Sequence, residues 1–379
     1  MKKPRIPAVE YIRGVAMMGV IGIHVGSEYL TNPASNAQLT ALFEIASRFS
    51  VPIFFFLSAF GLFYQMGEAE TFDYLGFLRR RLRAVLVPYL AWSLFYLIHD
   101  GIVYGVVFPI LSLPSILFFG TAKYQLYFLV ILVWLYVLMP IWIPVVRRMT
   151  WRWMMPLFLL QVGFDWAFSS WLPLYSYIAG LPAGSLWRQL LEYRLNYWVM
   201  HYAFVFLLGG WLALRMDWFL GFLRRRRGAI VAAFWVSLAA LVGYYYALMR
   251  VDGYTQIEAV NTAHQLCFFG IVYTVAASLF FFAVFQYPCA LLSRLLPVFG
   301  LLGRHSYFVY LAHPVAITYL SLLLAATGRV MTAPAAILFY LSVLGLALIG
   351  AVICRKAGER VPLVNLLTIG IMPNKKLQD

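Results

Sequence analysis

The feature that most constrains this chain is a succession of apolar stretches, each about 20 residues long. A helix of that length spans the hydrocarbon core of a bilayer. We count ten such stretches in the 379 residues. The sequence therefore predicts an all-α, polytopic integral membrane protein with about ten transmembrane helices. The expected helices cover residues 8–30, 40–65, 84–104, 124–146, 153–172, 195–215, 228–249, 262–286, 299–324 and 334–354.

The composition supports a membrane protein. The chain is 63% hydrophobic and only 11% charged, whereas a soluble domain is closer to half apolar and a quarter charged. The first stretch carries Arg13 and His24 and shows no cleavage site before Glu28, which argues against a signal peptide. We expect one transmembrane domain over residues 1–379 and no soluble domain.

The basic residues predict the orientation of the chain. A net charge of +15 in a soluble protein would suggest nucleic acid, but here the charge clusters between the apolar stretches. This pattern predicts membrane topology and contact with anionic lipids, and no nucleic-acid partner. A cytoplasmic N-terminus places most of the 29 lysines and arginines inside, so we expect both termini in the cytoplasm. These inner residues include Lys2, Lys3, Arg5, Arg147, Arg148, Arg224 to Arg227, Arg355, Lys375 and Lys376.

The cysteines and short motifs predict no metal site. Cys267, Cys289 and Cys354 are three in number, and their spacing fits neither a disulfide framework nor a zinc site. No HExxH, GxSxG, Walker or GxGxxG motif is present.

The first apolar stretch contains two ionisable side chains of particular interest. Arg13 and His24 are eleven residues apart, which is about three helical turns, so both face one way roughly 16 Å apart. Glu10 precedes them and Glu28 follows. Ionisable residues inside a membrane are costly and indicate function, and histidine is suited to proton transfer near neutral pH. Alternatively, His24 forms an inter-helix hydrogen bond.

The second stretch holds Glu44 and Arg48 at positions i and i+4, followed by Pro52. The two charges either simply neutralise each other on one helix face or have a functional role. Pro52 is expected to kink the helix, which either widens a cavity or only bends the span.

A basic cluster follows at Arg79, Arg80, Arg81 and Arg83. Its guanidinium groups either contact lipid headgroups or bind a polyanion, such as the phosphates of a nucleotide-bearing cofactor.

The ninth stretch carries polar residues on one helical face. Ser306, Tyr310 and His313 are spaced i, i+4 and i+7, and His313 has nearly the expected depth of His24. We expect the two histidines to meet in a pocket in the outer half of the membrane. Gln125 and Tyr127, at the start of the fourth stretch, can also reach this pocket. His99 and Asp100 are interpreted as interfacial or structural.

Taken together, these motifs resemble the acyltransferase-3 family of integral membrane O-acyltransferases, which modify bacterial surface glycans. The likeness extends over nearly the whole chain. Ala59 stands where the family usually has glycine, and Tyr124 to Tyr127 replace a His-Leu-Trp segment of many members. The matching residues are Glu10, Arg13 and His24, the segment Pro52 to Gly61, Arg80 and Arg83 followed by Pro88 and Tyr89, and Gly303, Ser306, Tyr307, Tyr310, Leu311 and His313.

The resemblance implies an acyl-CoA donor, expected to be acetyl-CoA, and an extracytoplasmic glycan or lipid-linked sugar as acceptor. It places the protein in the inner membrane of a bacterium, with a homo-oligomer or an envelope-synthesis partner as further possibilities. His24 would be the catalytic base or the acceptor of the acyl group, and Glu28 would orient it. Arg13 would lie near the cytoplasmic opening through which the donor enters. The donor would bind Arg79, Arg80, Arg81, Arg83, Ser306 and Tyr310, and the acceptor would bind His313, Gln125 and Tyr127.

A second class of function also fits the ionisable residues Glu10, Arg13, His24 and Glu28 of the first apolar stretch. A transporter or flippase for a polysaccharide or a lipid-linked sugar would line its translocation path with similar residues. A structural role in an envelope-synthesis complex is a third interpretation.

Overall fold

The computed structural model describes residues 3–31, 36–67 and 72–371. Lys2, Lys375 and Lys376, which entered the orientation prediction, lie outside these residues. Contacts divide the chain into two compact units. The first comprises Met1–Glu68, Val146–Ser170 and Tyr202–Leu348, and the second comprises Ala69–Val145, Trp171–His201 and Ile349–Asp379. The regular structure of the described residues is helical, which confirms the all-α class. The single transmembrane domain and the cytoplasmic termini stay predictions.

Seven helical segments in the described part of the chain are long and apolar enough to cross a membrane. They are α1 (Pro7–Thr31), α2 (Ala37–Ser47) together with α3 (Ser50–Met66), α4 (Tyr74–Tyr104), α14 (Arg227–Arg250), α16 (Phe268–Gln286), α17 (Ala290–Ala326) and α18 (Ala333–Arg360). The count rises to nine if each of two bent pairs is one span. In the first pair α6 (Tyr127–Val137) meets α7 (Met139–Arg148) at 68°, and in the second the segment Val199–Leu214, which contains α12 (Ala203–Leu214), meets α13 (Met216–Arg225) at 100°.

Each of the ten expected stretches contains a helix, but not all of these helices are long enough to cross a membrane. The stretch 153–172 forms α8 (Met154–Ser169), whose 16 residues extend about 24 Å against a hydrocarbon core of about 30 Å. The expected helix 84–104 begins earlier, at Tyr74, because Asp73 caps it by accepting a hydrogen bond from the Gly76 N–H at 2.9 Å.

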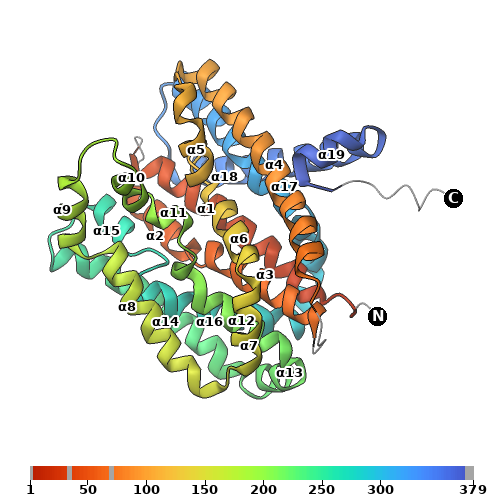
Figure 1. Cartoon of the computed structure of the whole chain (residues 1–379). Helices are drawn as coiled ribbons and strands as arrows, with labels where there is room; N and C mark the ends of the chain where they lie inside the picture. Colours follow the sequence, from red (N-terminus) through yellow and green to blue (C-terminus); the bar gives the residue numbers. More distant parts are fainter. Residues whose placement is uncertain (1–2, 32–35, 68–71, 372–379) are drawn as a thin grey trace. The chain divides into compact units, whose positions relative to one another are not determined.

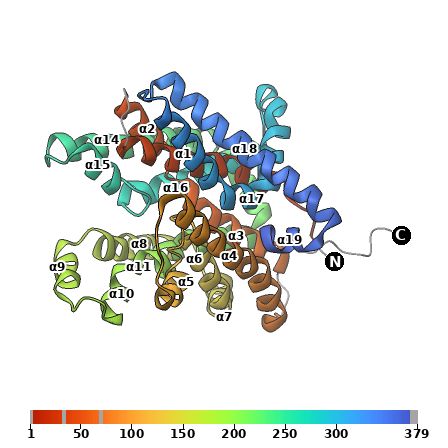
Figure 2. The same ribbon diagram turned by 90° about the horizontal axis from the view of Figure 1, so that it is seen from above.

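Helix α1 lies at the centre of the first unit, where it packs against α17, α2, α3 and α16. Both views show α1 between α2 and α17 (Figure 1 and Figure 2). Glycines allow the close approach to α2. A Cβ at Gly22 would lie 2.7 Å from the Ser47 hydroxyl oxygen, and one at Gly26 would lie 2.8 Å from the Cβ of Glu44. Small residues at i and i+4 commonly bring membrane helices together in this way.

The break between α2 and α3 has a local cause. Proline has no N–H to bond the carbonyl four residues earlier, and its ring crowds that carbonyl. For Pro52 that residue is Arg48, which caps the end of α2. The Ser47 and Ser50 hydroxyls instead donate to the Phe43 and Ser47 carbonyl oxygens. The predicted kink at Pro52 is thus found as a helix break at Arg48–Phe49.

The second unit is organised around α4, which packs against α6 and α19 (Pro362–Ile369). The Tyr74 hydroxyl donates to the Val137 carbonyl at 2.9 Å, and the Trp92 indole donates to the Thr368 carbonyl at 3.3 Å. Short helices also occur between α4 and α6 and between α8 and α12. The former are η1 (Ile110–Ser112) and α5 (Leu113–Phe119), and the latter include α9 (Leu172–Gly180), α10 (Leu186–Glu192) and α11 (Arg194–Tyr197).

Candidate active site

The packing of α1 on α17 fixes the two helices at one point. A Cβ on Gly303 would overlap the carbonyl oxygen of Glu10, and one on Gly14 would overlap the carbonyl oxygen of Phe299. The backbones therefore touch, as Gly permits. Beside this contact the Glu10 carboxylate forms a 3.0 Å salt bridge with Arg304. We call these residues the glycine contact.

Further along the same two helices the imidazoles of His24 and His313 stack on each other. Their ring centroids are 5.2 Å apart and the planes differ by 25°. His313 is fully buried, whereas His24 is partly exposed. The sequence placed these residues at similar depth, and the structure brings them together. An accessible histidine backed by a buried one is a geometry suited to proton transfer.

The protonation pattern of His313 follows from its hydrogen bonds. Its Nδ1 lies 2.8 Å from the Tyr310 carbonyl oxygen and 3.2 Å from that of Val309. A carbonyl oxygen only accepts, so Nδ1 carries a proton and donates in these contacts. These bonds hold the imidazole that supports His24.

Ser306 and Tyr310 share the buried face of α17 with His313, as their spacing predicts. The Ser306 hydroxyl donates to the Gly303 carbonyl oxygen at 2.9 Å. The ring of Tyr310 lies 6.3 Å from that of His313. Both side chains are less than a tenth exposed.

Glu44 and Arg48 form a buried ion pair beside this face of α1. The guanidinium binds the Glu44 carboxylate at 2.5 Å, with side chains 12% and 2% exposed, respectively. One of the two interpretations, mutual neutralisation, is thereby confirmed.

The other expected catalytic residues lie on α1. Arg13 is exposed although Ile12 and Gly14 beside it are buried, and Glu28 is partly exposed. The described partner of the Glu10 carboxylate is Arg304 on α17. The roles predicted for Arg13 and Glu28 stay predictions.

The basic cluster belongs to the second unit and lies within the first turns of α4. Arg79, Arg80, Arg81 and Arg83 are exposed. Arg80 approaches the Asp73 carboxylate at 3.8 Å, and the Arg81 guanidinium lies 5.8 Å from the ring centroids of both Phe77 and Tyr136. Several exposed guanidinium groups on one helix can bind a polyanion.

Gln125 and Tyr127 also belong to the second unit. Gln125 is buried and its side chain forms a hydrogen bond with that of Tyr96. Tyr127 begins α6 and is partly exposed. Their predicted meeting with the two histidines stays a prediction.

An ion cluster in the second unit was not predicted. The Lys123 ammonium group binds the two Asp100 oxygens at 2.8 and 3.0 Å, and His99 Nδ1 lies 2.8 Å from the Asp100 carboxylate. All three side chains are at most 13% exposed. The cluster ties the end of α4 to the segment before α6, which is a structural role.

The cysteines take no part in this geometry. Cys267 caps α16, where its thiol accepts a hydrogen bond from the Gly270 N–H, and burial raises its pKa to about 11. Within residues 3–31, 36–67 and 72–371, no three His, Cys, Asp or Glu side chains are placed to hold a metal ion.

Comparison with protein families decides the class of the protein. Residues 6–356 match the acyltransferase-3 family model, described as an acyltransferase domain. The chain belongs to the acyltransferase-3 family. Comparison with curated proteins and with solved structures gives no match. The resemblance inferred from the motifs is therefore confirmed, and the long apolar helices make this acyltransferase a multi-pass membrane protein.

Proposed function

We propose that this acyltransferase moves an acyl group, expected to be acetyl, from cytoplasmic acyl-CoA to a hydroxyl group of an extracytoplasmic carbohydrate or lipid-linked sugar. The observation that carries the proposal is the stacked His24–His313 pair between α1 and α17, in a chain that belongs to the family. The protein would act in the inner membrane of a bacterium.

His24 is the proposed general base. It takes the proton from the acceptor hydroxyl while that oxygen attacks the thioester carbonyl carbon. The C–S bond then breaks, and the proton passes from His24 to the leaving sulfur, so that CoA departs as the thiol. A base positioned in this way contributes about 10²–10⁴-fold to the rate. Transfer through an acyl-His24 intermediate is the covalent variant of the same proposal.

His313 is the proposed positioning residue for His24, because its ring stacks on that imidazole and its Nδ1–H is held by the Tyr310 carbonyl. In this scheme Glu28 orients His24 from the next turn of α1. Arg13, Ser306 and Tyr310 contact the donor arm, and Gln125 and Tyr127 contact the acceptor.

The exposed arginines of α4 are the proposed site for the phosphates of CoA. Arg79, Arg80, Arg81 and Arg83 present four guanidinium groups within five residues, and guanidinium binds phosphate through paired hydrogen bonds.

The test is acyl transfer in membranes that contain the protein. Labelled acetyl-CoA and a glycan acceptor are supplied to wild type, to His24→Ala and to His305→Ala. The last is a matched control, since His305 lies on α17 beside Ser306 but off the face that bears His313. We expect transfer by wild type and the control and a loss of at least about 10²-fold in His24→Ala. Undiminished transfer by His24→Ala would refute His24 as the base, and acceptor movement across vesicles without CoA would favour a transporter.

A further inference from the structure

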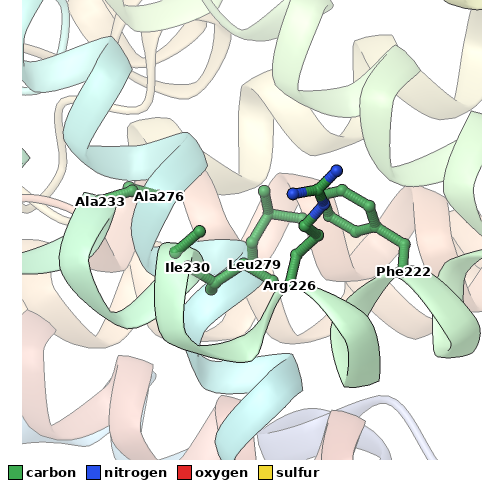
Figure 3. A pocket seen from close by; sticks show the side chains of 7 residues that line it. Phe222, Arg226, Ile230, Ala233, Ala276 and Leu279 are labelled. Carbon is green, nitrogen blue, oxygen red and sulfur yellow. The ribbon is translucent and has the colours of Figure 1, made fainter.

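An apolar groove of about 310 Å³ lies on the first unit, and neither His24 nor His313 lines it. Its walls come from α13, α14 and α16. In Figure 3, Arg226 and Phe222 stand at one end of the groove, and Ala233 and Ala276 stand at the other. Ile230 and Leu279 lie between them. Apart from Arg226, every residue that lines the groove is apolar.

Helix α13, which forms one wall, has the properties of a helix that lies along a membrane surface. It turns by 100° from the preceding apolar helix. Phe219 and Leu223 on one face are fully buried, whereas Trp218 is 48% exposed. A basic amphipathic helix with an exposed tryptophan is typical of the membrane interface. With α13 at the membrane interface, we expect the groove to begin near the lipid headgroups.

The mouth of the groove is strongly positive. Arg224, Arg225, Arg226 and Arg227 are consecutive and exposed, and within the described residues no carboxylate forms a salt bridge with any of them. Arg226 alone among the four lines the groove. From Arg226 to Ala233 the groove follows seven residues of α14, about 10 Å. A cation thus marks one end of an otherwise apolar groove.

We propose that this groove binds one anionic phospholipid of the leaflet that faces Arg224 to Arg227. One acyl chain lies along Ile230, Ala233 and Leu279, and the phosphate binds the Arg226 guanidinium. Charge complementarity selects this occupant, because a lipid with a zwitterionic headgroup carries its own cation beside the phosphate and gains less from Arg226. The inference is independent of the acyl-transfer proposal.

The site can be tested on the full-length protein in nanodiscs that hold equal amounts of phosphatidylglycerol and phosphatidylcholine. Lipid retained by the protein is measured by native mass spectrometry after release. We expect wild type to retain phosphatidylglycerol in preference to phosphatidylcholine. In Arg226→Gln this ratio should fall by about tenfold, as for the loss of a charge-assisted hydrogen bond. Arg227→Gln is the matched control and should keep the wild-type ratio.

A second pair of variants tests the apolar part of the site. Ala233→Trp fills the groove and should abolish lipid retention, whereas Ala232→Trp, on a neighbouring exposed position that does not line it, should not. Equal retention of both lipids by wild type would overturn the proposal. The proposal would also be overturned if the two variants of either pair changed lipid retention equally. Charge or bulk anywhere on this surface would then be enough to alter lipid retention.

Discussion

The glycine contact between α1 and α17 makes a quantitative prediction for Gly303→Ala. The added methyl group would overlap the Glu10 carbonyl oxygen and lie 2.8 Å from the carbonyl carbon. Both atoms belong to the backbone of a buried helix, so no side chain can rotate away. The helices must separate, and the stacked rings of His24 and His313 must shift with them.

The expected cost combines two opposed effects. Overpacking a tight interface costs about 1–3 kcal/mol, whereas replacing glycine by alanine inside a helix gains about 1 kcal/mol. The net loss for Gly303→Ala is therefore about 0–2 kcal/mol. Gly345→Ala in α18 is the matched control, because a Cβ there meets nothing within 4 Å. It should gain up to about 1 kcal/mol, which leaves a difference of about 1–3 kcal/mol between the two variants.

The assay is the free energy of unfolding of the purified protein in detergent micelles, measured together with the rate of acyl transfer. A displacement of reacting groups by about 1 Å can cost about 10²-fold in rate, so Gly303→Ala should lose transfer and Gly345→Ala should not. If Gly303→Ala were as stable as Gly345→Ala and transferred at the wild-type rate, the close backbone contact would be refuted.

Three further outcomes are expected. Lys123→Met leaves the buried Asp100 carboxylate without its ammonium partner and should lower the free energy of unfolding by about 3–5 kcal/mol. Lys123→Arg keeps the charge and should lower the free energy of unfolding less, and an equal decrease in both variants would contradict the ion cluster. An impermeant maleimide at pH 7.5 should label the exposed Cys289 only from the predicted cytoplasmic side. It should leave Cys267 unlabelled until the pH approaches the raised pKa of about 11, because only the thiolate reacts; labelling of Cys289 from the other side would reverse the predicted orientation. Arg80→Ala with Arg83→Ala should raise KM for acyl-CoA at unchanged stability, since exposed charge pairs contribute only about 0–1 kcal/mol; an equal rise in the control Arg224→Ala with Arg225→Ala would point to general surface charge.

Much of the fold was predictable because hydropathy and length decide what crosses a bilayer. The expected stretches at 8–30, 228–249 and 334–354 correspond closely to α1, α14 and α18. The bends were harder to predict. The apolar run that leads into α13 turns by 100° at Arg215–Met216, and no proline or glycine stands at that point. Only the change from apolar to amphipathic pattern could have indicated the turn.

The site was predictable where helical spacing and depth were enough, as for His24 and His313. Residues on one helix keep a fixed relation, and two helices of known direction give comparable depths. Depth in the membrane does not reveal which helices lie next to one another. The packing of α2 on α1 depends on Gly22 and Gly26, where an added Cβ would meet Ser47 and Glu44. The Lys123–Asp100–His99 cluster depends on a fold-back of the chain that spacing does not encode.

His24 and its positioning residue His313 are proposed to act as one unit in acyl transfer. A double-mutant cycle tests this proposal, with the transfer rates of His24→Ala, His313→Ala and the double variant compared at saturating acetyl-CoA. Residues that act as a unit are strongly non-additive. We expect the double variant to be no slower than His24→Ala alone. Losses that simply multiply would contradict the claim, because each histidine would then act independently of the ring stacked on it.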